Sequence, residues 1–354
     1  MSGPKPLMAL SHRQLAGGLI AFSALAWAGL WTARWLDRGG AATATLSQPM
    51  PAGSLLVALA LVVADFLLGG LRLHLWVRRL APRARYALSV QVYLVNLAAS
   101  AVSPLGLAAG PAQWAVLVRG GVGGADAVAA LLLNFVGILT ALVSLAGVGV
   151  AYVVLGSGPA GSLAGLERAG LLACAGLAGL LLVGLLNPRV GLAVAAGISR
   201  LGGSIAGRAG ELLAAVGGRL ERGVAEYRAA LAAVRGGWPL RLAANVGISS
   251  LMLLDRCLIG FLVAVSLGFT GSYTEAAARQ LLQALLLYFS PSPGGSGLAE
   301  ATVPVCMAGV VPAGRSMEYA LVWRVLTSYI GIAVGAMAAT AAFGRRRAVA
   351  AAGA

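Results

Sequence analysis

Long apolar runs separated by short clusters of arginine constrain this chain more than any other feature of its sequence. Hydrophobic residues make up 59% of the 354 residues and charged residues only 10%, whereas about a quarter of a soluble domain is usually charged. A run of about 20 apolar residues is long enough to cross a bilayer as a helix. The sequence therefore predicts an all-α polytopic membrane protein that forms a single integral membrane domain over residues 1–354.

Clusters of arginine between the apolar runs predict the orientation of the chain. The formal net charge of +15 would indicate nucleic-acid binding in a soluble protein, but here the arginines lie mostly in short clusters between hydrophobic segments. Short basic loops of this kind mark the cytoplasmic side of a membrane. The clusters at 78–85 and 345–347 therefore predict a multi-pass membrane protein with both termini cytoplasmic and no nucleic-acid partner.

Six apolar runs are predicted to be full transmembrane helices, at about residues 15–35, 54–77, 125–155, 171–186, 239–268 and 318–343. A signal peptide cut after Ala26 is the alternative for the first run, but the apolar stretch continues to the length of a membrane helix, which favours an uncleaved span. The glycine-rich loop at 156–167 is then external. Residues 189–238 mix arginine and glutamate with alanine and leucine, which indicates an amphipathic connector on the cytoplasmic surface, either bound to anionic lipids or purely structural.

Two further apolar segments, residues 86–119 and 276–311, are interrupted by proline and glycine. Proline removes a backbone donor, and non-helical backbone at membrane depth persists only where protein or a water-filled cavity surrounds it. Each half of the first segment is too short to cross alone. We therefore predict two re-entrant broken-helix hairpins, the first entered from the cytoplasm and the second from outside. A single kinked helix that crosses fully is the alternative for the first.

The two interrupted segments resemble each other. Pro104 precedes Gln113 by the same spacing as Pro291 precedes Glu300, and each unit consists of an apolar half, a Pro/Gly break, a polar side chain and a glycine-rich turn. Inverted repeats with discontinuous helices are a signature of secondary transporters, so the pattern indicates a transport protein.

The segment SPSPGGSGLAE at 290–300, the Gly309-Val310 turn and the Trp323-Arg324 pair together resemble the lysylphosphatidylglycerol synthase transmembrane-domain family. This family is the membrane half of the multiple peptide resistance factors and includes stand-alone members, some associated with hopanoid lipids. Arg72 and Trp76 are similar to the Arg-x-x-x-Trp helix end of the family, whereas Pro111-Ala112-Gln113 stands where many members have a Gly-Glu or Gly-Gly pair. The resemblance implies the flippase half of such a protein without its synthase, located in the bacterial cytoplasmic (inner) membrane.

These observations favour a lipid translocase, which moves a polar headgroup between leaflets while the lipid tails stay in the bilayer. Arginine binds a phosphate through several donors, and Arg72, Arg256 and Arg324 would form a ladder for it. A structural ion pair with Asp65 or Asp255 stays open for Arg256, and we favour simple snorkelling for Arg72. Glu300 is either functional or a structural partner of Arg324 or Arg256. The predicted substrate-binding residues are Asn96, Gln113, Asp255, Arg256, Pro293, Gly294, Gly295, Glu300 and Arg324.

Two other functions stay open: a secondary transporter of a small solute or ion, and a membrane-embedded lipid-modifying transferase. A transferase would need Asp65, Asp255 or Glu300 as its catalytic carboxylate. The sequence contains no nucleotide-binding loop, metal-ligand cluster or nucleophile arrangement, so we expect no enzyme activity, no metal and no cofactor. The predicted partner is a membrane phospholipid or another polar lipid, and a homo-oligomer is left open.

Overall fold

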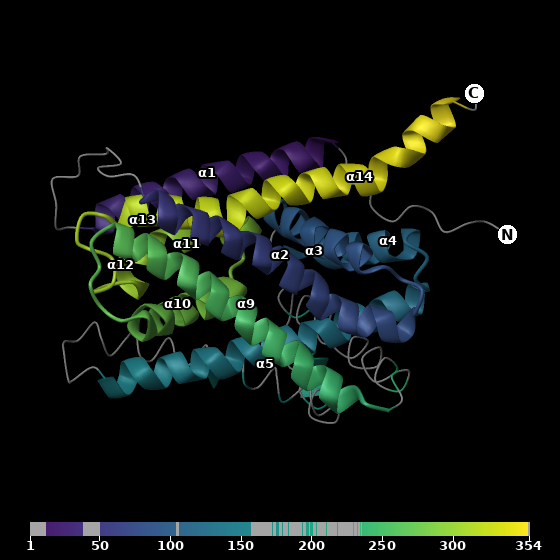
Figure 1. The fold of residues 1–354 in the computed structure, drawn as a ribbon, viewed down its shortest axis with the longest axis horizontal. Coiled ribbons are helices and arrows are strands. Elements are labelled where there is room, and N and C mark those ends of the chain that lie inside the picture. The colour runs from purple at the N-terminus through teal and green to yellow at the C-terminus, as the bar shows by residue number, and fades with distance from the viewer. Residues whose placement is uncertain are drawn as a thin grey trace.

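A computed structural model describes residues 12–37, 50–103, 106–156 and 236–352 of the chain, together with isolated positions between 157 and 235. Its long helices are α1 (His12–Leu36), α2 (Ala52–Leu80), α5 (Gly124–Gly156), α9 (Trp238–Ser266) and the continuous series α13 (Ser316–Arg324), η3 (Val325–Tyr329) and α14 (Ile330–Ala352). Helices α1, α5 and α14 run close to the long axis of the molecule, and α2 and α9 run obliquely to it (Figure 1).

Five helical stretches in the described residues are long and apolar enough to cross a membrane. They are Gly17–Leu36, Ala52–Leu80, Gly124–Tyr152, Trp238–Ser266 and Ser316–Phe343. These stretches coincide with five of the six predicted spans, and the prediction of an all-α polytopic membrane protein is confirmed. The predicted span at 171–186, the loop at 156–167 and the connector at 189–238 lie outside the described residues, apart from isolated positions at their edges and within them.

The first interrupted segment folds as a helical hairpin. Its arms are α3 (Tyr86–Ala101) and α4 (Ala109–Arg119). The amide of Gln113 donates to Asn96 Oδ1 at 2.8 Å, and Gly120, just after α4, packs against Leu88 near the start of α3. The second arm therefore runs back along the first, so that the start of α3 and the end of α4 lie side by side.

The second interrupted segment folds in the same way from shorter pieces. Its first arm is α10 (Tyr273–Tyr288), and its return arm consists of η2 (Pro293–Gly295), α11 (Leu298–Ala301) and α12 (Val303–Cys306). The amide of Gln283 donates to the carbonyl oxygen of Ala299 at 2.9 Å, and Gly309 lies beside the guanidinium of Arg279. The return arm therefore runs antiparallel to α10. That either hairpin ends inside a membrane stays a prediction.

The two halves of the chain repeat each other in length and order. Helices α2 and α9 each contain 29 residues, and α3 and α10 each contain 16. Tyr86 and Tyr273, which begin the hairpins, are about 187 positions apart, and so are Gln113 and Glu300. Asp65 of α2 forms an ion pair with Arg256 of α9, and further along α2 the backbone carbonyl of Arg72 accepts from Asn245, which lies earlier in α9. These two helices therefore run antiparallel. This is the arrangement expected of an inverted repeat.

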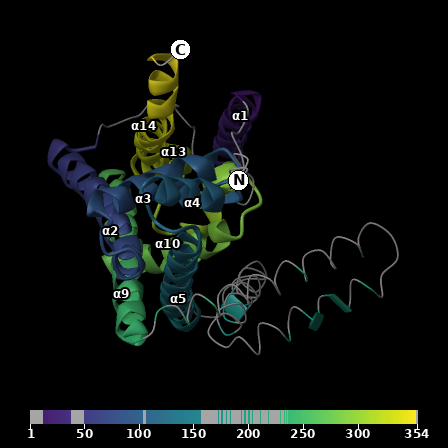
Figure 2. The ribbon, with the colours of Figure 1, turned by 90° about the vertical axis from the view of Figure 1, so that its right-hand side faces the viewer.

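The hairpins exchange their packing partners. The first arm of each hairpin lies against the long helix that comes after the other hairpin in the sequence. In the first half, α3 runs antiparallel to α14, and Gln91 donates to the carbonyl oxygen of Ala338 at 3.3 Å. In the second half, α10 runs antiparallel to α5, and the ring of Tyr288 lies 6.5 Å from that of Phe135. Figure 2 shows α3 and α4 between α14 and α5.

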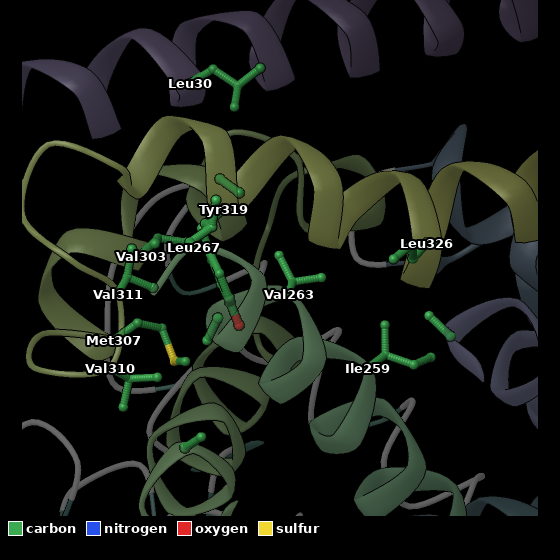
Figure 3. Packing of buried hydrophobic residues seen from close by; sticks show 14 of the residues in the cluster. Leu30, Ile259, Val263, Leu267, Val303, Met307, Val310, Val311, Tyr319 and Leu326 are labelled. Carbon is green, nitrogen blue, oxygen red and sulfur yellow. The ribbon is translucent and has the colours of Figure 1, made fainter. Parts of the chain in front are cut away.

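Helix α1 covers both hairpin tips. Gly18 packs against the carbonyl of Val102 at the tip of the first hairpin, and Gly29 packs against the backbone of Gly297 at the tip of the second. Further along the chain, Leu30 points from α1 into an apolar cluster formed with Val263 of α9 and Tyr319 of α13 (Figure 3). A side chain on either glycine would separate α1 from the hairpins.

The basic ends of three elements lie at the same end of the molecule. Arg119 at the end of α4 donates to the carbonyl oxygen of Ala342 at 3.2 Å, and its guanidinium lies 4.3 Å from the ring centre of Phe343. The last turn of α2, which carries Arg78 and Arg79, shares an apolar cluster with the same part of α14. The arginine clusters used to predict the orientation are therefore on one side of the fold.

Candidate functional site

The tip of the second hairpin is built from glycines in backbone conformations that other residues rarely adopt. Gly294, Gly295 and Gly297 have φ angles of 56°, 71° and 84°, and Pro293 before them is buried. Only glycine adopts such angles without steric cost. A Cβ on Gly294 would lie 3.2 Å from the Cα of Ala101, which ends α3. The two hairpins therefore meet tip to tip.

A fully buried ion pair lies directly behind this tip. Arg324 Nε lies 2.9 Å from Glu300 Oε1, and the exposed fraction of the side chain is 5% for the arginine and 0% for the glutamate. The other carboxylate oxygen, Oε2, accepts the backbone N–H of Gly297 at 2.7 Å, so both oxygens are used at the start of α11. Of the partners left open for Glu300, the structure selects Arg324. Such a pair is costly to break, because either partner alone would be a buried charge.

The remaining donors of Arg324 tie the long C-terminal helix to the hairpin tip. Its Nη2 donates to the carbonyl oxygen of Gly294 at 3.2 Å, and its Nη1 donates to Ser328 at 2.9 Å. Ser328 lies in η3, a π-helical turn that begins directly after Arg324. The guanidinium also lies 5.9 Å from the ring centre of Phe22 and 5.6 Å from that of Tyr329, within range of cation–π attraction. π-helical turns are frequent at functional sites.

A second charged cluster joins α2, α3 and α9. Arg256 contacts Asp65 with two nitrogens, Nε at 2.9 Å and Nη2 at 3.2 Å. Nη2 also donates to the hydroxyl of Tyr93 at 2.8 Å, and that hydroxyl donates to Asp65 Oδ2 at 2.7 Å. Of the two ion pairs left open for Arg256, the structure contains the one with Asp65. The arginine keeps 39% of its side chain exposed, so it can still meet another ligand.

Asp255 is adjacent to Arg256 in the sequence but does not pair with it. The residue is 8% exposed, and its Oδ2 is buried without a hydrogen-bond partner. Successive residues of a helix point in different directions, which separates the two side chains. The structure therefore places the predicted Asp255 beside the cluster rather than within its hydrogen bonds.

Arg72 is buried within the protein, and the snorkelling interpretation is wrong. The residue is 5% exposed, and its Nε and Nη1 have no hydrogen-bond partner. Its backbone carbonyl accepts the side-chain amide of Asn245 at 3.1 Å, and that amide also donates to Asn134 at 3.2 Å. Snorkelling needs a free path to the interface, but here the crossing of α2 with α9 and α5 encloses the side chain.

The chain matches the family model of the lysylphosphatidylglycerol synthase TM region over residues 14–335. It belongs to this family. The match runs from α1 to the first turns of α14 and confirms the family that the broken segment and the Arg-x-x-x-Trp helix end suggested. Membership identifies a membrane protein of lipid-related function. A comparison with curated proteins found no match.

In this member of the lysylphosphatidylglycerol synthase TM region family, the first hairpin carries a neutral polar pair. The predicted residues Asn96 and Gln113 hydrogen-bond to each other between α3 and α4, and both are partly buried. The structure thus assembles the predicted residues into three groups: the Asn96–Gln113 pair, the Asp65–Arg256 cluster with Asp255 beside it, and the hairpin tip with Glu300 and Arg324.

Sequence reasoning missed several residues that complete these groups. Tyr93 links Asp65 to Arg256, and Ser328 holds Arg324. A signal existed for Tyr93, because it lies three residues before Asn96 and therefore on the same face of α3. Ser328 carried a comparable signal, because it lies four residues after Arg324 and therefore on the same face of the helix. Asn245 gave none, since its partners are distant in the sequence.

Proposed function

We propose that the protein is a lipid translocase that carries a polar headgroup between the two leaflets. The proposal rests on one observation: two broken hairpins meet tip to tip, where Arg324 holds the second tip, and Arg256 contacts the first arm of the first hairpin through Tyr93. Membership of a family with lipid-related function supports it.

The physical basis is the cost of moving a polar headgroup through hydrocarbon. A phosphate or other charged group loses its hydration unless protein donors replace it. Arginine offers several donors in a planar arrangement that suits phosphate oxygens. Arg256 and Arg324 are each held by a carboxylate, so a headgroup would have to compete for them rather than meet a free cation. Such competition keeps binding weak enough for release.

The orientation follows from the shared basic end of α2, α4 and α14. We propose that this end faces the cytoplasm, because short arginine clusters favour that side. The first hairpin then opens to the cytoplasm and the second to the outside, and the headgroup passes where their tips meet.

Reconstituted protein tests the proposal directly. Proteoliposomes that contain a headgroup-labelled fluorescent phospholipid should lose nearly all fluorescence when an impermeant reductant is added, whereas protein-free vesicles should lose only the outer-leaflet half. A soluble dye trapped in the same vesicles should be retained. Equal loss of the dye would contradict the translocase and favour a solute pathway.

The same vesicles separate the remaining alternatives. Mass spectrometry of the extracted lipids should show the input species unchanged. A new lipid species that depends on the protein would indicate the membrane-embedded transferase. The proposed function would be overturned if folded and inserted protein left the inner-leaflet label as protected from the reductant as it is in protein-free vesicles.

A further inference from the structure

Asp255 is a buried carboxylate with an oxygen that no donor in the described part of the chain satisfies. The residue is 8% exposed, and its Oδ2 is inaccessible to solvent and accepts no hydrogen bond. Asp65 and Glu300 are buried as well, but each accepts from an arginine and from a second donor. An ionised carboxylate without a partner is strongly unfavourable in the interior, so this group is expected to bind a cation or to carry a proton.

Asp255 lies deep within the membrane-spanning part of α9. The span Trp238–Ser266 ends 11 residues after it. At about 1.5 Å of rise per residue, the nearer end of the helix is about 16 Å away, roughly half the thickness of a hydrocarbon core. An ionisable side chain at such a depth is costly to keep and is a candidate for function.

The charged groups around Asp255 do not neutralise it. Its charge interacts with that of Asp65 on α2 and with that of Arg256, its neighbour on α9. Arg256 is the cation of the two, and its Nε and Nη2 are already bound to the oxygens of Asp65. An ionised Asp255 would therefore repel Asp65 and compete with it for the same guanidinium.

The other titratable groups beside Asp255 are uncharged at neutral pH. Cys257 lies two residues further along α9, and Tyr273 begins α10; both interact with Asp255. Beyond Cys257, α13 contributes Tyr319, and α5 contributes the apolar Leu145. A thiol and phenols carry no charge near pH 7, so they cannot balance an ionised carboxylate.

These surroundings suit a proton better than a metal ion. A hard cation needs about six oxygen ligands. The hydroxyl of Tyr273 instead donates to the carbonyl oxygen of Leu254 at 2.9 Å, and the described residues contain no group of acidic, histidine or cysteine side chains that could hold a metal. A proton needs only the single oxygen that lacks a donor.

We propose that Asp255 is the proton-binding site through which the protein couples translocation to a proton gradient. The inference rests on the proposed translocase function and adds its energy source. The proton adds to Oδ2 from water on one side of the membrane and leaves to water on the other, and no other bond changes. With Asp255 ionised, the group formed with Asp65 and Arg256 carries one net negative charge, and protonation removes it. The two states therefore differ in the hold on Arg256, which contacts the first hairpin through Tyr93.

Infrared spectroscopy of the full-length chain in vesicles tests the proton site without requiring transport. As the pH is raised, the wild type should lose the absorption band of a protonated carboxyl group. Asp255→Asn, which has the shape of the protonated form, should not show this change. Asp126→Asn, the same substitution in the first turn of α5, is the matched control and should show it as the wild type does. A wild type without this change, or the same change in Asp255→Asn, would overturn the inference.

An imposed pH gradient tests the coupling. The vesicles would contain the headgroup-labelled fluorescent phospholipid, and an impermeant quencher would report the share of label in the outer leaflet. One pH unit is a tenfold difference in proton activity, so one proton per lipid should shift the leaflet ratio in the wild type by up to about tenfold. Asp255→Asn should leave the label evenly distributed, and Asp255→Glu, which keeps a carboxyl group, should restore part of the shift. An ionophore that collapses the gradient should abolish it.

The two proposals fail separately. Three results would contradict the proton coupling but not the translocase: label that the wild type distributes evenly despite the gradient, an Asp255→Asn variant that follows the gradient as the wild type does, and an equal shift driven by a sodium gradient at constant pH. Label that moves under no condition would contradict the translocase. The loss of the infrared change in Asp255→Asn would then still identify the proton site.

Discussion

The two hairpins have the same construction, but the first is held by a neutral hydrogen bond and the second by an ion pair. Each has a first arm of 16 residues, a break and a return arm with a polar residue at the equivalent position, Gln113 in the first and Glu300 in the second. Gln113 bonds to a neutral amide within its own hairpin, whereas Glu300 is fully buried and needs Arg324 from another element. The repeat therefore sets the architecture twice, but among the described residues only the second copy contains a fully buried ion pair.

The largest expected effect concerns the side of the membrane to which each hairpin opens, because labelling at each site should be either complete or absent. In a variant without the native cysteines, Arg83→Cys before α3 and Thr270→Cys before α10 should react with an impermeant maleimide from opposite faces. Arg83→Cys should be labelled only after the membrane is permeabilised, and Thr270→Cys in intact cells. Labelling of both from one face would exclude the inverted arrangement. Detergent-solubilised protein, in which both sites should react, is the control.

Breaking the ion pair of the second hairpin should cause the largest loss of stability. Arg324→Gln leaves Glu300 buried without its cation, which should cost about 3–5 kcal/mol of unfolding free energy. Thermal melting in detergent would measure the loss. The double change Glu300→Gln with Arg324→Gln replaces the pair by two amides and should recover most of the stability.

The double variant also separates structure from function. If the charges serve translocation, it should fold and yet translocate at least tenfold more slowly, a difference of about 1.4 kcal/mol in the barrier. Wild-type translocation by the folded double variant would show that the pair only holds the hairpin in place.

The contact between α1 and the second tip should give an intermediate effect. Gly29→Ala places a methyl group against the backbone of Gly297, which cannot move aside as a side chain could, and should cost about 1–3 kcal/mol. Gly17→Ala in the same helix, where no atom lies within 4 Å, should leave the melting temperature unchanged or slightly raised. Similar melting temperatures for the two variants would mean that α1 does not pack on the tip.

The neutral pair of the first hairpin should give the smallest effect. Gln113→Met keeps the length of the side chain but removes its hydrogen bond to Asn96, which should cost about 1 kcal/mol. A loss as large as that of Arg324→Gln, measured under the same conditions, would show that the two hairpins do not differ in the way described above.

The sequence predicts the elements of this fold better than it predicts their partners. The length of each apolar run predicts the membrane spans, and the positions of the prolines predict both breaks. These features can be predicted because in lipid each segment has to satisfy its own backbone hydrogen bonds. The Asp65–Arg256 pair joins residues 191 positions apart, and periodicity alone carries no information on such a contact. Arg72 was interpreted as an interfacial residue because it precedes the basic cluster at 78–85, and only the crossing of α2 with α9 shows that it is enclosed.

The packing of α3 against α14 also has a consequence for biogenesis. Helix α3 carries Gln91, and one of the surfaces against which it packs belongs to α14, which the ribosome makes after both hairpins. Until then, the side-chain amide of Gln91 lacks the acceptor on α14 that it has in the folded chain. The first half of the chain therefore cannot reach its final packing before α14 has been synthesised.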